Sequence, residues 1–78
     1  MEERRTHIRH RVLKSGKIFL GRAAVTCAVR NVSEGGACLE MQTTFGIPSF
    51  FELAIADQPA RACKVKWLDG TRLGVQYQ

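Results

Sequence analysis

Two arginines near the start of the chain, Arg5 and Arg9, have a spacing suited to holding an anion. Because they are four residues apart, both side chains lie on one side of either an extended or a helical segment. In an extended segment their Cα atoms stand roughly 13 Å apart at about 3.3 Å per residue, which suits opposite ends of a dinucleotide-sized ligand. Guanidinium groups bind phosphate oxygens bidentately, and arginine commonly contacts the O6/N7 edge of guanine. The pair alone fits a solvated basic tail equally well.

A second polar group interrupts the apolar pattern at Asn31-Val32-Ser33-Glu34-Gly35-Gly36. The Asn31 amide oxygen and the Ser33 hydroxyl are acceptors for the N1 and N2 donors of a guanine. Gly35 and Gly36 permit positive φ and carry no Cβ, so the backbone itself can approach a ligand here. A tight turn closed by local Asx- and Ser-type hydrogen bonds is the alternative interpretation.

The positive charge of the chain is concentrated at its N-terminal end. The 78 residues carry a net charge of +5. The basic residues before position 18, opposed there only by Glu2 and Glu3, are Arg4, Arg5, Arg9, Arg11, Lys14 and Lys17. Such a cluster favours an anionic partner, with phosphate as the first candidate. A hydrophobic content of 45% with 24% charged residues is typical of one small folded domain with a single site.

In the segments that must position the arginine pair and the polar turn, apolar residues recur at every second position. Val25, Cys27 and Val29 alternate with polar or small residues, which predicts half-buried strands. The predicted strands are Val12–Leu20, Ala24–Val32, Ala37–Met41, Phe50–Ala56, Ala60–Leu68 and Arg72–Tyr77. A small sheet with one apolar face must bury that face and hide its edges. The sequence therefore predicts an all-β fold, a six-stranded antiparallel β-barrel over residues 12–78, preceded by a flexible basic arm at residues 1–11.

The three cysteines predict neither a disulfide framework nor a zinc site. Cys27, Cys38 and Cys63 are odd in number, widely spaced and without a Cys-x-x-Cys pair, so we expect reduced thiols at core positions and no metal. His7 and His10 are expected to be solvated side chains of the arm. With no signal peptide and no apolar run of bilayer length, the expected location is cytoplasmic, without membrane insertion.

The remaining candidates for chemistry give little support to catalysis. Asp57 and Asp69 lie in predicted turns far along the chain from either histidine, so no nucleophile, base and orienting acid come together. Trp67 alternates with Cys63 and Val65, which favours core packing over stacking on a base. A binding domain is predicted, not an enzyme.

Together the arm and the turn resemble the signature of the PilZ domain family, which is an Arg-x-x-x-Arg arm followed by an Asp/Asn-x-Ser-x-x-Gly turn. One predicted strand separates the two motifs, as in that family. Val65-Lys66-Trp67 and Leu73-Gly74-Val75 are also similar to late family elements, so the resemblance spans residues 4–77. Asn31 stands where many members carry aspartate, and the resemblance therefore implies the loss of one charge-assisted contact to guanine.

What the resemblance implies is a bacterial receptor that binds the second messenger cyclic di-GMP on the outside of the barrel. Arg5 and Arg9 would bind phosphate and guanine, and the turn would seat one base. Arg4, directly before the motif, implies an intercalated ligand dimer. The ligand-binding residues are then Arg4, Arg5, Arg9, Asn31, Ser33, Gly35 and Gly36. Ordering of the arm would signal to a downstream protein in motility, exopolysaccharide or biofilm control.

Two other functions fit parts of the pattern. A small basic β-barrel that binds single-stranded nucleic acid agrees with the pI of about 9.6, but it needs exposed aromatic residues. Aromatic residues make up only 8% of the chain and fall mostly on predicted core faces. A ligand-free adaptor that only docks proteins is the third possibility, and the intact arm and turn motifs argue against it.

Overall fold

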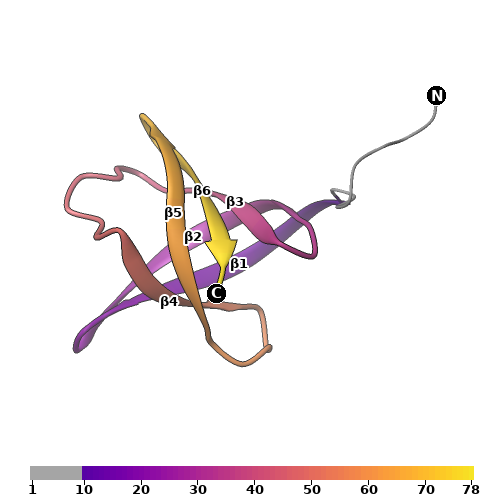
Figure 1. Cartoon of the computed structure of the whole chain (residues 1–78), viewed down its shortest axis with the longest axis horizontal. Coiled ribbons are helices and arrows are strands. Elements are labelled where there is room, and N and C mark those ends of the chain that lie inside the picture. The colour runs from indigo at the N-terminus through magenta and orange to yellow at the C-terminus, as the bar shows by residue number, and fades with distance from the viewer. Residues whose placement is uncertain (1–9) are drawn as a thin grey trace.

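The chain forms an all-β structure in the computed structural model, which describes the backbone of residues 10–78 and the side chains of residues 13–78. The strands in Figure 1 are β1 (His10–Leu20), β2 (Ala23–Val32), β3 (Gly36–Glu40), β4 (Phe50–Ile55), β5 (Arg61–Asp69) and β6 (Arg72–Tyr77). Each predicted strand agrees with an observed one to within two residues at either end. No helix long and apolar enough to cross a membrane occurs in this part of the chain.

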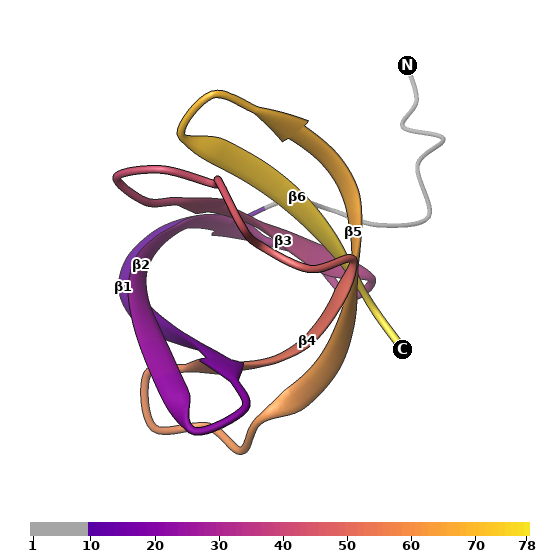
Figure 2. The same ribbon diagram turned by 90° about the vertical axis from the view of Figure 1, so that its left-hand side faces the viewer.

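The six strands close into a barrel in the order β1-β2-β3-β6-β5-β4, which Figure 2 shows end-on as a ring. All neighbouring strands are antiparallel. Pairing of Gly16 in β1 with Ile55 in β4 closes the ring on one side, and pairing of Leu39 in β3 with Leu73 in β6 closes it on the other. Each strand has a partner on both sides over at least part of its length, so no strand lies at an open edge of the sheet. The predicted six-stranded antiparallel barrel is confirmed.

Each strand contributes one completely buried side chain to the core. From β1 to β6 these residues are Ile18, Val29, Leu39, Leu53, Cys63 and Leu73. Every second residue along a strand faces inward, which explains why the alternating apolar sets could be read from the sequence. Burial of each of the aliphatic side chains in this set is worth about 1.5–3 kcal/mol.

Three irregularities interrupt the pairing. They lie between Arg11 and Lys14 in β1, between Val29 and Asn31 in β2 and between Val65 and Trp67 in β5. An extra residue in one strand reverses which face the following side chains occupy. The prediction that Trp67 packs in the core is therefore wrong. Trp67 lies on the outer face opposite Gly74, with 42% of the residue exposed.

The expectation that the aromatic residues mostly face the core is also wrong. Phe51 is buried, and Tyr77 packs against the core from its edge. Phe19, Phe45 and Phe50 are 39%, 91% and 60% exposed. The cause for Phe50 and Phe19 is their alternation with the inward-facing Phe51 and Ile18, while Phe45 lies in the connection between β3 and β4.

The turn after β4 holds Ala56 at a φ of 53°, where a Cβ crowds the backbone. Replacing Ala56 by glycine is expected to raise the free energy of unfolding by about 0.5–1 kcal/mol, since relief of that crowding outweighs the added freedom of the unfolded chain. Urea denaturation measures the change. The control is Ala60→Gly, in a nearby exposed position without a positive φ, which should lose stability. Loss of stability in both variants would contradict the prediction.

Candidate functional site

The turn between β2 and β3 is fixed by hydrogen bonds. The Ser33 N–H donates to the Gly36 carbonyl at 2.8 Å, and the Ser33 hydroxyl donates to the same oxygen at 3.4 Å. The Tyr77 N–H donates to the Gly35 carbonyl at 2.8 Å, which ties the turn to the end of β6. Asn31 and Ser33 are half-buried at its start. The local hydrogen-bonded turn is therefore present, and it gives the polar side chains a defined backbone.

Glycine is needed in this turn for a different reason from the one expected. A Cβ on Gly36 would lie 2.0 Å from the Val75 carbonyl oxygen, because β6 passes directly against β3 at this point. Neither Gly35 nor Gly36 adopts the positive φ that glycine permits, so the backbone conformation itself does not require glycine here. Gly36 thus allows a close approach of two strands, and this approach sets the position of the turn.

The start of β1 lies next to this turn. His10 pairs with Val32 and Arg11 pairs with Asn31 across β1 and β2. His10 and Arg11 are the last two residues of the predicted arm, and they belong to β1, so this end of the arm lies beside the turn. Arg4, Arg5 and Arg9, like His7, lie outside the described residues. The structure therefore brings together the C-terminal end of the predicted arm and the Asn31–Gly36 turn.

A row of cross-strand partners extends from Asn31 over the outer face. Asn31 pairs with Cys38, Cys38 with Gly74, and Gly74 with Trp67. A Cβ on Gly74 would lie 2.2 Å from the Trp67 Nε1, so the indole lies against the bare backbone of β6. Sequence reasoning missed this arrangement because the irregularity in β5 is not visible in the residue types. The signal in the sequence that could have indicated this contact between Trp67 and Gly74 is the pair of Val-x-Trp and Leu-Gly-Val elements.

Cys38 differs from the other two cysteines. Its neighbours Ala37 and Leu39 belong to the core cluster, so its side chain points to the outer face, although the residue is buried. Cys27 and Cys63 lie in the core as predicted, and all three thiols are free. Among residues 10–78, no three histidine, cysteine or acidic side chains gather closely enough to hold a metal ion.

Burial raises the pKa of the Cys27 thiol from 9.0 to about 11. Between these values the unfolded chain loses the proton and the native protein keeps it, so stability falls as the pH rises. We expect Cys27 to account for a loss of about 2 kcal/mol in the free energy of unfolding between pH 8 and 11. Chemical denaturation across this range measures it. The pKa values of Cys63 and Tyr77 are also raised by burial, so Cys27→Ala should flatten the dependence without removing it. Equal slopes in the two proteins would contradict the assignment.

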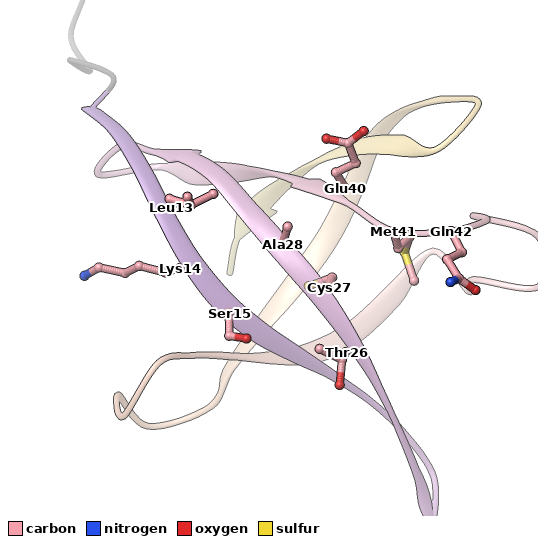
Figure 3. Close-up of a pocket in the computed structure, with 9 residues that line it drawn as sticks. All are labelled: Leu13, Lys14, Ser15, Thr26, Cys27, Ala28, Glu40, Met41 and Gln42. Atoms are coloured by element: carbon pink, nitrogen blue, oxygen red, sulfur yellow. The ribbon is translucent and has the colours of Figure 1, made fainter.

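A groove of about 460 Å³ lies between the β1–β2 hairpin and the start of the β3–β4 connection. Figure 3 shows Leu13, Lys14 and Ser15 on one strand, with Met41 and Gln42 across from them. Of the predicted ligand-binding residues that the structure describes, Asn31, Ser33, Gly35 and Gly36, none lines it. Glu40, the one carboxylate among the described lining residues, is engaged at 3.2 Å by Arg30 and at 3.7 Å by Arg72. Because these two ion pairs already neutralise the Glu40 carboxylate, it is not free to pair with a cationic ligand.

The structure is thus a small closed antiparallel barrel with a hydrogen-bonded polar turn beside the start of β1. The family model for the PilZ domain matches residues 3–78, and the chain belongs to this family. The predicted membership is confirmed. PilZ domains are binding and adaptor domains rather than enzymes, and the ligand of the family is cyclic di-GMP. A search of curated proteins found no match to this chain.

Proposed function

We propose that this protein is a cyclic di-GMP receptor in which Arg5 and Arg9 hold the ligand against the Asn31–Gly36 turn. The observation that carries the proposal is the pairing of His10 with Val32, because it joins the arm to the barrel beside a turn whose backbone is fixed. Membership of the PilZ domain family supports the identity of the ligand. The positive charge of the N-terminal region supports binding of its two phosphates.

The chemistry divides between the arm and the turn. The guanidinium groups of Arg5 and Arg9 neutralise phosphate and contact a guanine edge, while Asn31 and Ser33 accept from the N1 and N2 donors of a base. Asn31 supplies a neutral acceptor, which makes a weaker contact than a carboxylate. Arg4 adds a cation for a second, intercalated cyclic di-GMP, so the bound species is a ligand dimer.

Ligand binding fixes the arm across the turn and so creates a new surface for a downstream protein. The receptor acts in this way in the bacterial cytoplasm, in control of motility, exopolysaccharide production or biofilm formation. Binding only to the folded state also stabilises it, by about 2.7 kcal/mol at a ligand concentration one hundred times Kd. The proposal therefore includes a rise in melting temperature on addition of cyclic di-GMP.

Titration calorimetry with cyclic di-GMP tests the proposal directly. Arg5→Ala, Arg9→Ala and Ser33→Ala should each weaken binding, by about 10- to 100-fold for the arginines, since each removes a charge-assisted contact. The matched control is Arg22→Ala, at an exposed position between β1 and β2, which should bind normally. Two ligands per chain are expected, and Arg4→Ala should reduce this to one. Absence of heat at tens of micromolar ligand would refute the proposal.

Exposure of Phe45, Phe50 and Trp67 favours testing a second function, the binding of single-stranded nucleic acid. These rings come from the β3–β4 connection, β4 and β5, and they do not form one continuous series along paired residues. Stacking of successive bases needs such a series. Salt-sensitive binding of unrelated oligonucleotides, with no preference for cyclic di-GMP, would establish this function instead.

A further inference from the structure

An apolar groove of about 420 Å³ lies on the outer face of β1, β4 and β5. Phe19 in β1 pairs with Glu52 in β4, and Glu52 pairs with Ala62 in β5, so these side chains share one face of the sheet. Phe50 lies on the same face, two residues before Glu52. Phe19 and Phe50 are thus diagonal neighbours on this face, and both rings are exposed and line the groove. Aromatic rings exposed beside a groove offer a partner a large apolar contact area.

The groove is separate from the proposed cyclic di-GMP site. One row of paired residues runs from Gly36 through Gln76 and Lys64 to Phe50. It crosses three strand spacings, or roughly 14 Å at about 4.8 Å each. No residue of the Asn31–Gly36 turn lines the groove. Both sites can therefore be occupied at the same time.

The surroundings of the groove are mainly basic. Lys17 lies on the same face two residues before Phe19, and the Lys64 Nζ stands 5.9 Å from the centre of the Phe50 ring. Arg22 is exposed and follows Gly21, which lines the groove. Among the lining residues that the structure describes, Glu52 is the only carboxylate. A second copy of the chain, with the same net charge of +5, is repelled, whereas an acidic partner is attracted.

We propose that this groove docks a partner protein through an acidic segment that carries an aromatic or large aliphatic side chain. The apolar side chain enters between Phe19 and Phe50, and flanking carboxylates pair with Lys17 and Lys64. Glu52 accepts a backbone N–H of the segment. Recognition depends on side chains, because the three strands beneath the groove are paired with one another where Phe19, Glu52 and Ala62 lie. The docking surface exists without cyclic di-GMP, so the inference goes beyond the proposed function.

The test uses amide chemical shifts of the isotope-labelled full chain. The added peptide is an acetylated hexapeptide with four acidic residues around a phenylalanine and a leucine, compared with the same peptide carrying lysines in place of the acids. The acidic peptide should produce saturable shifts at Phe19, Phe50 and Glu52. Phe50→Ser and Lys64→Glu should weaken binding at least about tenfold. Phe45→Ser removes a more exposed ring elsewhere and should leave binding unchanged.

Three results would overturn the inference. These are no shift at the groove up to about 5 mM acidic peptide, an equal response to the lysine peptide, and self-association in sedimentation that Phe50→Ser abolishes. The last result would assign the groove to a second copy of the chain. Calorimetry with cyclic di-GMP on Phe50→Ser should match the unchanged protein, so failure of the docking surface and failure of the ligand site are distinguished.

Discussion

Replacing Gly36 by alanine is expected to lower the free energy of unfolding by at least about 3 kcal/mol and to abolish cyclic di-GMP binding. The added Cβ would lie 2.0 Å from the Val75 carbonyl oxygen and 3.3 Å from the Gln76 Cα. Both are backbone atoms of β6, so no side-chain rotation can relieve the overlap. β3 and β6 must separate where they close the barrel, and the turn moves with them. Urea denaturation followed by circular dichroism measures the loss.

Glu34→Ala is the matched control, because Glu34 is exposed in the same turn. Its stability should stay within about 0.5 kcal/mol of the unchanged protein. If Gly36→Ala were equally mild, the close contact between β3 and β6 would be contradicted. If Gly36→Ala lost stability as expected but kept its affinity for cyclic di-GMP, the turn would not be part of the ligand site.

The strands could be predicted because each has one buried face. In β2 the inward residues Val25, Cys27 and Val29 alternate strictly with outward ones, and this period of two is a property of the local sequence. The order of the strands in the barrel, by contrast, is not a property of the local sequence. Pairing of β1 with β4 and of β3 with β6 joins segments far apart in the chain, and it depends on closure of the whole sheet. The sequence predicts that closure only through the need to hide edges.

The candidate site could be predicted in its residue types but only partly in its geometry. Asn31, Ser33 and Gly36 stand out because small polar residues and glycine interrupt an apolar pattern. The need for glycine at position 36 arises from Val75, which is 39 residues away in the chain. The alternation with Cys63 and Val65 predicts the wrong face for Trp67, because one extra residue in β5 reverses it. Tertiary proximity and strand irregularities leave no local signature.

Replacing Gly74 by alanine is expected to displace the Trp67 indole and to lower the free energy of unfolding by about 2–3 kcal/mol. The new Cβ would lie 2.2 Å from Nε1 and 2.5 Å from Cε2 of that ring. A planar indole cannot yield by a few tenths of an ångström, so the whole side chain must rotate away from β6. Trp67 is the only tryptophan, and its fluorescence emission should therefore shift to longer wavelength as the ring becomes solvated.

A double-mutant cycle separates this contact from a general weakness of β6. In the Trp67→Ala background the ring is absent, and Gly74→Ala should then stabilise the protein by about 0.5 kcal/mol, because alanine is preferred over glycine within a strand. A similar loss of stability in both backgrounds would show that the overlap does not involve Trp67. Gly74 and Trp67 lie on the row of partners that starts at Asn31, so calorimetry on the same variants also measures how far the ligand face extends from the turn.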